Sequence, residues 1–375
     1  MRLSSPAASP DVSVIMPVRN GQRFVEAAVR SILAQTHANF ELLAIDDAST
    51  DATPAILDRL AAADGRIRVL RDGRPGLVGA LNRGLAEARG ALVARMDADD
   101  VAMPGRFELQ LAAFARAPDL AVVGGQVAFI DAAGDDLRRL SRHPLDPAAI
   151  AARLARGDCV VAHPTVMARR AVLADLGGYR AAYLCAEDID LWLRVAERAP
   201  IGNLPDVVLR YRIHADQVSA RQRLRQMFST DLAVRTASLR RAGAPDPTSR
   251  AAGPIDWHDA DAIAALGPDV AEIASLFAAM DRIYSGPVRG WTGDALRETD
   301  GDRTCATRRG WLCAPAVSGP RTPAAFGAGG ASAGPGGEAD RADVAGRPVA
   351  DPDRPLARGP HARPRLTAIL IGDRP

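Results

Sequence analysis

The sequence predicts an α/β fold in which helices flank a central mixed, mainly parallel sheet. Short β-rich runs alternate with longer helical patterns between residues 12 and 100, as they do in successive βαβ units. Acidic clusters follow two of these strands, and open α/β sheets bind ligands where their strands end. With 47% hydrophobic residues among 375, the chain can also build a substantial core.

The individual elements are recognised from apolar runs and from capping residues. We expect strands at residues 12–16, 41–45, 67–70 and 91–96, and helices at residues 24–34, around 56–60 and at 77–89. Asp51 or Thr50 is expected to cap the second of these helices. After Pro104 the pattern is less regular, with helices expected near residues 106–115 and 189–198 and strands near 121–123 and 127–130.

The composition excludes several classes of function. All 47 basic residues are arginine, so no lysine amine can act in catalysis. The net charge of +2 provides no strong field for DNA or RNA, and we expect no nucleic-acid partner. The four cysteines lack the paired spacing of zinc sites, which favours a reducing cytoplasm. No apolar run reaches signal-peptide or membrane-spanning length, so we expect at most peripheral membrane contact, at the inner face.

The segment Asp97-Ala98-Asp99 directly follows an apolar strand. Two carboxylates one residue apart can share a turn and offer oxygens to Mg²⁺ or Mn²⁺, and such a cation neutralises a substrate diphosphate. For this spacing alone, a solvated acidic turn is the alternative, because such turns are common after strands. The context favours a cation, since three carboxylates cluster at the mouth of a buried strand in a chain without lysine.

A second acidic pair, Asp46-Asp47, follows another strand of the same sheet. A carboxylate at the depth of Asp47 can accept a hydrogen bond from the ring imide of uracil or thymine. The first strand ends at Pro17, Val18 and Asn20, whose backbone is expected to line the nucleoside. The alternative for the acidic residues is that they only cap the next helix.

A third acidic pair, Glu187-Asp188, begins a predicted amphipathic helix. Acidic residues often only stabilise the positive end of a helix, and that alternative stays open here. Over the same crevice, however, a carboxylate can remove the proton from an acceptor hydroxyl as a general base. Asp188 is our candidate for this role.

Taken in order, these motifs resemble those of family 2 glycosyltransferases, which are inverting enzymes with a Rossmann-like GT-A fold. The resemblance covers about residues 11–220 and is specific because many short motifs occur in the family's order. The segments that carry it are residues 14–21, 45–51, 80–84, 95–100, 163–167, 177–180, 187–188 and 211–214.

The resemblance implies roles for individual residues. In such enzymes Asp47 would contact the donor base, Asp99 would bind the Mn²⁺ or Mg²⁺ ion, and Asp188 would be the base. Asp97 is expected to contact the donor ribose or sugar, and His214 is expected to approach the metal or the diphosphate. The complete donor-binding set expected here is Pro17, Val18, Asn20, Asp47, Asn82 and Asp97.

An organisation and an activity follow from the same resemblance. We expect a flexible N-terminus at residues 1–10 and a glycosyltransferase domain at 11–245, with a nucleotide-binding half at 11–100 and an acceptor-side half at 101–245. A helical extension at 246–300 and a Gly/Pro-rich, poorly ordered tail at 301–375 would follow. The expected reaction moves a sugar, with inversion, from a UDP- or dTDP-sugar to a glycan, lipid-linked or other hydroxyl acceptor. Cell-surface polysaccharide or glycoconjugate synthesis is the expected setting.

Two alternative functions stay open. A nucleotidyltransferase also joins a Rossmann-like sheet to a carboxylate-bound metal, but residues 17–21 are not its glycine-rich phosphate loop. A catalytically silent nucleotide-sugar-binding protein would keep the fold. The presence of both Asp99 and Asp188 argues against that second alternative.

Overall fold

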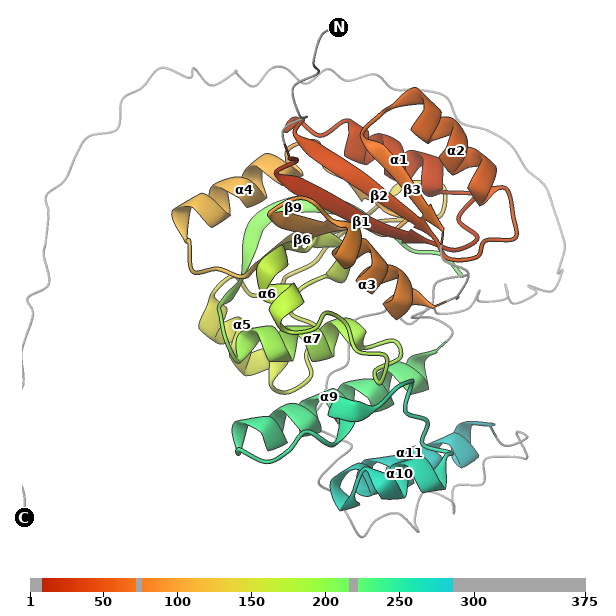
Figure 1. The fold of residues 1–375 in the computed structure, drawn as a ribbon, viewed down its shortest axis with the longest axis vertical. Coiled ribbons are helices and arrows are strands. Elements are labelled where there is room, and N and C mark those ends of the chain that lie inside the picture. The colour runs from red at the N-terminus through yellow and green to blue at the C-terminus, as the bar shows by residue number, and fades with distance from the viewer. Residues whose placement is uncertain (1–8, 72–75, 216–221, 286–375) are drawn as a thin grey trace, which may run out of the picture. The chain divides into compact units, whose positions relative to one another are not determined.

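A mixed sheet of nine strands organises the part of the chain that the structure, a computed structural model, describes: residues 9–71, 76–215 and 222–285. The predicted tail at 301–375 and most of the predicted N-terminal segment lie outside the described residues. The strands are β1 Val12–Val18, β2 Phe40–Asp46, β3 Ile67–Arg71, β4 Leu92–Arg95, β5 Val101–Ala102, β6 Val122–Ile130, β7 Asp136–Leu140, β8 Met167–Arg169 and β9 Ile201–Arg212. Their order is β3-β2-β1-β4-β8-β6-β9-β5, with β7 paired to β6 (Figure 1).

Helices connect and cover these strands. They are α1 Val25–Leu33, α2 Thr53–Ala63, α3 Leu77–Glu87, α4 Arg106–Arg116, α5 Pro147–Leu154, α6 Arg170–Asp175, α7 Glu187–Ala196, α9 Arg223–Arg241, α10 Ala260–Ala265 and α11 Pro268–Ser285, with short 3₁₀ turns η1 His163–Thr165 and η2 Pro247–Arg250. Strands β3, β2, β1 and β4 run parallel, whereas β8 pairs antiparallel with both β4 and β6. The predicted α/β fold with a mixed sheet between helices is therefore confirmed.

The sheet separates two apolar layers, and β1 shows how the sequence builds both. Every residue of β1 is buried, as expected for a central parallel strand with both faces covered. Its side chains alternate, so that Val14 and Met16 join the layer of α1, α2 and α4, while Ile15 joins the layer of α3 and α7 (Figure 1).

Two sequence-based expectations about element boundaries are wrong. The strands expected near residues 121–123 and 127–130 form one strand, β6, which continues through two glycines. At Gly124 a Cβ would lie 2.3 Å from Asn203 Oδ1, so glycine lets β9 approach closely. The N-cap of α2 is Ala52, and Asp51 instead accepts a hydrogen bond from the Thr53 N–H at 2.9 Å.

Residues beyond β9 form a helical layer that shares the core of the α3–α7 face. Helix α9, which the sequence analysis missed, contributes Phe228, and the following segment contributes Trp257 and Phe277. The Phe228 ring centroid lies 5.1 Å from that of Trp257 and 5.5 Å from that of Phe277. The described part of the predicted extension, residues 246–285, is therefore packed against the sheet-containing core through α9.

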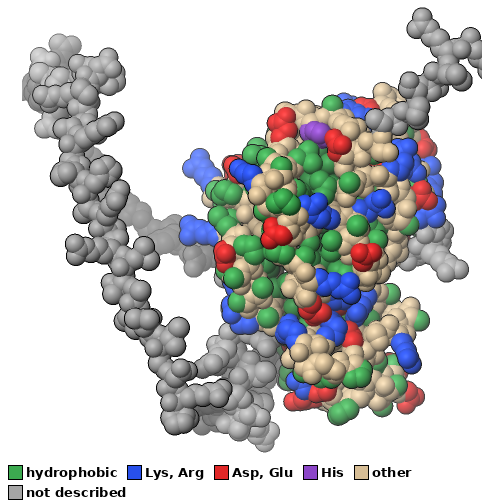
Figure 2. All heavy atoms as spheres, turned by 60° about the vertical axis from the view of Figure 1, so that its left-hand side comes forward, with side chains coloured by type: hydrophobic (Ala, Val, Ile, Leu, Met, Phe, Trp, Pro, Cys, Tyr) green, Lys and Arg blue, Asp and Glu red, His purple; other side chains and the backbone are tan. Residues whose placement is uncertain are grey.

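The described helices include no membrane span, and one face of the molecule shows mixed charge. Within residues 9–71, 76–215 and 222–285, no helix is both long enough and apolar enough to cross a bilayer. On the face shown in Figure 2, arginine and acidic side chains are interspersed rather than gathered into one patch. This distribution agrees with the small net charge of +2.

Candidate active site

Three parallel strands bring the predicted donor-binding residues other than Asn82 to one edge of the sheet. Strands β2, β1 and β4 lie side by side, with Val18 of β1 opposite Asp46 of β2. Pro17 and Val18 are the last residues of β1, Asp47 follows β2, and Asp97 follows β4 by two positions. The carboxyl ends of these strands therefore meet where ligands of open α/β sheets bind.

Asn20 and Asp47 hold the loops at this edge. Asn20 has a φ of 51°, which asparagine tolerates better than most residues. Its Oδ1 accepts the Thr50 N–H at 2.8 Å, and its own N–H donates to Ser49 Oγ at 2.9 Å. Asp47 is buried, and its Oδ1 accepts the Gly76 N–H at 2.7 Å, just before α3. The loops after β1 and β2 and the start of α3 are thus held together.

Asp97, Asp99 and Asp100 gather just beyond β4. One carboxylate oxygen from each lies within 4.8 Å of the others. Burial, followed by the charges of Asp99 and Asp97, raises the pKa of Asp100 well above its ordinary value. Asp100 Oδ1 accepts the Arg212 N–H at 2.8 Å, whereas its buried Oδ2 has no hydrogen-bond partner within the described part of the chain. Clustered carboxylates with one unsatisfied buried oxygen fit a hard divalent cation.

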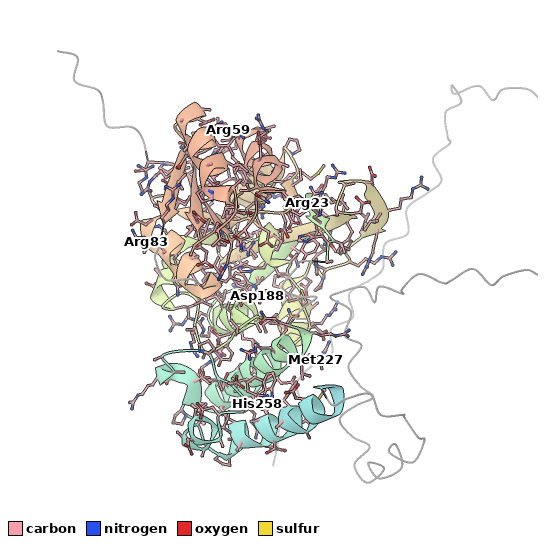
Figure 3. The ribbon with its side chains drawn as sticks, turned by 90° about the vertical axis from the view of Figure 1, so that its right-hand side faces the viewer. Arg23, Arg59, Arg83, Asp188, Met227 and His258 are labelled. Atoms are coloured by element: carbon pink, nitrogen blue, oxygen red, sulfur yellow. The ribbon has the colours of Figure 1, made fainter. Side chains whose placement is uncertain are left out.

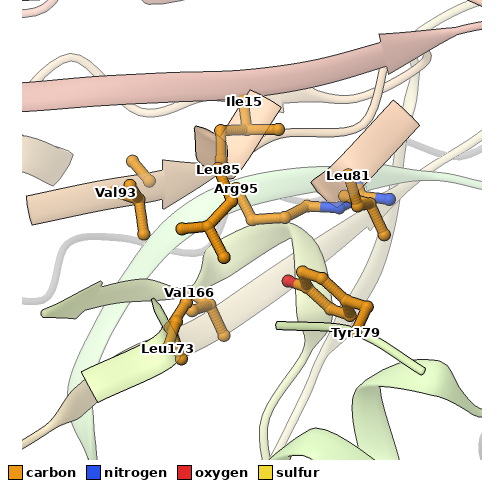
Figure 4. A pocket seen from close by; sticks show the side chains of 9 residues that line it. Ile15, Leu81, Leu85, Val93, Arg95, Val166, Leu173 and Tyr179 are labelled. Carbon is orange, nitrogen blue, oxygen red and sulfur yellow. The ribbon is translucent and has the colours of Figure 1, made fainter. Parts of the chain in front are cut away.

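Arg95 is a buried cation beside this acidic cluster. It is 6% exposed and forms an ion pair with Asp97, while no described residue accepts a hydrogen bond from its Nε. Its side chain crosses a small cavity whose other walls are mainly aliphatic (Figure 4). The other lining residues are Ile15, Leu81, Leu85, Val93, Ala94, Val166, Leu173 and Tyr179. The sequence analysis assigned Arg95 no role, although a charged residue at the end of an apolar strand was an available signal.

The end of β9 reaches the same cluster. His214 Nε2 lies 2.9 Å from Asp99 Oδ2, so two predicted metal ligands 115 positions apart are brought together. Arg212 Nε donates to the Asp99 carbonyl at 2.7 Å. The ring of Phe24, at the N-cap of α1, lies 4.9 Å from the His214 ring and 4.7 Å from the Arg212 guanidinium carbon. Phe24 and Arg212 are contributors that the sequence analysis missed.

Helix α7 brings the predicted base into the field of these charges. Asp188 lies in its first turn, and its Oδ1 accepts the Ile189 N–H at 2.8 Å. Burial raises the pKa of Asp188 to about 6, and the charges of Arg95 and Asp97 also act on it. Burial and the charge of Asp188 raise the pKa of Glu187 to about 8. A carboxyl with a pKa near 6 is suited to general-base catalysis at neutral pH.

Asn82 faces the protein backbone rather than the strand ends. Its Nδ2 donates to the Tyr179 carbonyl at 2.8 Å, and its Oδ1 accepts the Tyr179 N–H at 2.9 Å. The Tyr179 hydroxyl in turn lies 3.0 Å from His163 Nε2, and burial lowers the pKa of His163 well below its ordinary value. A contact between Asn82 and a donor stays a prediction, while His163 is a partly buried group with a hydrogen-bond partner.

The sequence is similar to known glycosyltransferases. Residues 13–177 match glycosyl transferase family 2. The putative glycosyltransferase EpsE of Bacillus subtilis is 34% identical over 219 residues, which cover 57% of this chain and 77% of EpsE. The O-antigen biosynthesis glycosyltransferase WbnJ of Escherichia coli is 33% identical over 207 residues, 54% of this chain and 80% of WbnJ. The amylovoran biosynthesis glycosyltransferase AmsE of Erwinia amylovora is 32% identical, over 56% of this chain and 79% of AmsE.

A solved structure supports the same fold at lower identity. S. aureus TarS 1-349 in complex with UDP-GlcNAc aligns with a TM-score of 0.50 and 19% identity. The alignment covers 61% of this chain and 66% of that one, so slightly less than two thirds of the TarS chain is matched. This structure supports the fold, and the relatives that are more than 30% identical over most of their length show the family. The chain belongs to glycosyl transferase family 2 and has a fold of the GT-A type.

Proposed function

We propose that this glycosyltransferase moves a sugar from a nucleoside-diphosphate sugar to an acceptor hydroxyl and inverts the anomeric carbon, with Asp188 as the base. The observation that carries the proposal is the approach of Asp188 to the charges at the strand end. The charges of Arg95 and Asp97 both act on the Asp188 carboxyl, whose pKa burial raises to about 6. Asp97 belongs to the acidic cluster that contains Asp99. The base thus comes from a helix and the diphosphate-binding acids from a strand end, which supports attack and departure on different sides of the sugar.

In the proposed step, Asp188 accepts the proton of the acceptor hydroxyl while the acceptor oxygen bonds to the anomeric carbon. The bond from that carbon to the diphosphate oxygen breaks, and its electron pair leaves with the diphosphate. A bound divalent ion, Mn²⁺ or Mg²⁺, would supply charge neutralisation for the leaving group. Asp99 would hold the ion, His214 would lie against it or the diphosphate, and Asp97 would contact the donor ribose or sugar.

For the donor we favour a UDP- or dTDP-sugar. The buried Asp47 carboxylate at the end of β2 suits the ring imide of uracil or thymine, and its hydrogen bond from Gly76 holds it in place. Pro17, Val18 and Asn20 would line the nucleoside from the neighbouring strand end. A guanine base offers a different hydrogen-bonding edge, so GDP-sugars are the discriminating comparison.

For the acceptor we favour a hydroxyl of a growing glycan, free or lipid-linked. WbnJ and AmsE are named for O-antigen and amylovoran biosynthesis, and this supports a role in cell-surface polysaccharide assembly. With a lipid-linked acceptor, the protein would contact the membrane only peripherally, through the half that binds the acceptor.

Donor breakdown tests the proposal without knowledge of the acceptor, because water can replace the acceptor hydroxyl. UDP-, dTDP- and GDP-sugars are incubated with Mn²⁺ or Mg²⁺, and nucleoside diphosphate release is measured for wild type, Asp188→Asn and Asp99→Ala. The matched control is Asp261→Asn, which changes an exposed carboxylate on α10. We expect wild type and control to be equally active and both site variants to be at least tenfold slower.

Two results would contradict the proposal. If the protein retains a nucleotide sugar but wild type releases no more nucleoside diphosphate than the site variants, it is a binding protein rather than an enzyme. If the released sugar keeps the donor's anomeric configuration in an NMR time course, the single displacement with Asp188 as base is wrong.

A further inference from the structure

The loop that leads into α7, residues 180–186, is held by the helical layer that follows β9; we call it the base loop. Asp188 follows this loop by two positions, between the sheet and the layer that carries Met227 and His258 (Figure 3). Within the loop, Cys185 adopts a φ of 66°, a conformation that side chains other than glycine seldom adopt. Contacts from outside the loop must therefore keep it in this shape.

A chain of hydroxyl groups fixes the middle of the base loop. The Tyr183 hydroxyl, which is fully buried, lies 2.8 Å from Thr236 Oγ1 of α9 and 2.7 Å from Thr248 Oγ1 of η2. Thr248 donates its only hydroxyl proton to Asp246 Oδ1 at 2.6 Å. Tyr183 must then donate its one proton to Thr248, and the one proton of the Thr236 hydroxyl goes to the Ala233 carbonyl at 3.1 Å or to Tyr183. The chain therefore runs in one direction and ends on the Asp246 carboxylate.

Asp246 also forms the ion pair that holds the base loop. Its Oδ2 accepts hydrogen bonds from Nη1 of Arg180, in the base loop, and from Nη1 of Arg240, in α9, each at 2.7 Å. Although burial acts to raise it, hydrogen bonds from Arg180 and Thr248 lower the pKa of Asp246 to about 2. The Arg180 guanidinium extends onward to α7, where its Nη1 lies 3.7 Å from Asp190 Oδ1. The Asp246 carboxylate thus connects α9, η2 and the base loop, and Arg180 extends the connection to α7.

Two more contacts close the base loop against the same layer. The Ile255 N–H donates to the Ala182 carbonyl at 3.2 Å, and the Cys185 thiol lies 3.2 Å from Gln222 Oε1. Contacts from residues 222–255 therefore reach four positions of the loop that precedes Asp188.

We infer that Asp246 and Thr248 are positioning residues, which act through Tyr183 and Arg180 to set where Asp188 meets the acceptor. This inference rests on the proposed role of Asp188 as base. Neither residue touches the strand ends where the donor would bind, so their loss moves the base and leaves the donor site in place. A displacement of about 1 Å in a reacting group lowers the rate by up to about a hundredfold. The turnover number should therefore fall while nucleotide affinity stays constant.

The test compares two buried threonines whose hydroxyl groups have different hydrogen-bond partners. Thr248→Val removes the hydroxyl that links Tyr183 to Asp246, and Thr248→Ser restores it. Thr230→Val is the matched control, because Thr230 is equally buried in α9 but its hydroxyl bonds, among the described residues, only to the Gln226 carbonyl of its own helix. Nucleoside diphosphate release gives kcat and KM for the donor, and calorimetry with UDP, dTDP or GDP plus Mn²⁺ gives nucleotide affinity.

We expect Thr248→Val to lower kcat about tenfold and to leave donor KM and nucleotide Kd within about twofold of wild type. Thr248→Ser and Thr230→Val should keep kcat within about twofold. Tyr183→Phe should lower kcat as much as Thr248→Val does. The double variant should have a kcat no lower than that of either single variant, since each single variant already breaks the hydrogen-bonded chain from Tyr183 to Asp246. If Thr248→Val is too unstable to purify, Asp246→Asn, which keeps the size but loses the charge, serves instead.

The possible failures are distinguishable. A wild-type protein that releases no nucleoside diphosphate contradicts the proposed function, and the inference falls with it. An active wild type in which Thr248→Val and Thr230→Val have equal kcat overturns the inference alone. A loss in kcat that is matched by an equal loss of nucleotide affinity also overturns it, because the effect is then a general loss of folding.

Discussion

Lowering the pH is expected to slow donor turnover along an acid limb centred near pH 6, because Asp188 can accept a proton only when it is ionised. The pKa of Asp188 is raised for a structural reason. Burial in the first turn of α7 raises the pKa of Asp188 from 3.8 to about 6, against the opposing effects of the Ile189 N–H and of Arg95. An exposed aspartate in the same position would stay ionised throughout the range of the assay.

The size of the effect follows from the two pKa values. With a pKa of about 6, the ionised fraction is roughly 0.9 at pH 7 and roughly 0.1 at pH 5, so kcat should fall about tenfold between them. With the ordinary value of 3.8, the ionised fraction would still exceed about 0.9 at pH 5, and kcat would change little. The profile therefore separates a buried base from an exposed one.

The assay is nucleoside diphosphate release at saturating donor and saturating Mn²⁺, measured from about pH 5 to about pH 8. Asp188→Asn should be slower by about a hundredfold or more and should lose the limb. Glu187→Gln is the control for the neighbouring acid, whose pKa burial and the charge of Asp188 raise to about 8, and it should keep the limb. The reasoning is refuted if wild type turns over equally fast at pH 5 and pH 7, or if Asp188→Asn retains the same limb.

Three other changes give separate tests. Asp99→Ala should raise the Mn²⁺ concentration for half-maximal activity about tenfold or more; an unchanged Mn²⁺ titration would mean that this carboxylate binds no metal. Phe24→Leu removes the ring that contacts His214 and Arg212, and we expect about tenfold weaker Mn²⁺ activation with an unchanged thermal midpoint; normal activation would show that the ring only fills space. Glu41→Gln should cost about 3 kcal/mol of unfolding free energy in urea at pH 7, because hydrogen bonds from arginine and serine outweigh burial and lower the Glu41 pKa from 4.5 to about 2. A lowered carboxyl pKa stabilises the fold above pH 4.5, so wild type should lose this contribution as the pH falls toward 2 while Glu41→Gln changes less; parallel pH curves for the two proteins would contradict the assignment.

The parallel half of the sheet was predictable because its signals are local. Each strand from β1 to β4 is a short apolar run, and each helix between them shows its own periodicity. Asp47 and Asp97 follow β2 and β4, so their meeting at one edge follows from the parallel order alone. The second half was less predictable, because β6, β8 and β9 pair across long sequence distances and β6 contains two glycines that usually end a strand.

The residues that contact the site residues could not be predicted from local sequence patterns. His214 was predicted only through the family resemblance, and its approach to Asp99 depends on β9 returning beside β5 and β6. Phe24 and Asp246 carry no chemical signal in the sequence, since a phenylalanine before a helix and an aspartate after one are ordinary. Their importance comes from contacts with residues far away in the chain, and those contacts exist only once the sheet and α9 have formed.

The charge of Arg95 links the acidic cluster beyond β4 to the predicted base on α7. Burial lowers the number of charges that the region can hold, and the pKa values of Asp97, Asp100 and Glu187 are all raised in response. Arg95 is the buried cation that acts on Asp97 and on Asp188 alike. Positive charge at the strand end that the donor diphosphate does not cancel would favour ionisation of all these carboxyls, including the base. Binding of a cation and donor beyond β4 and activation of the acceptor from α7 are therefore expected to be coupled through one electrostatic field, although the residues involved lie about ninety positions apart.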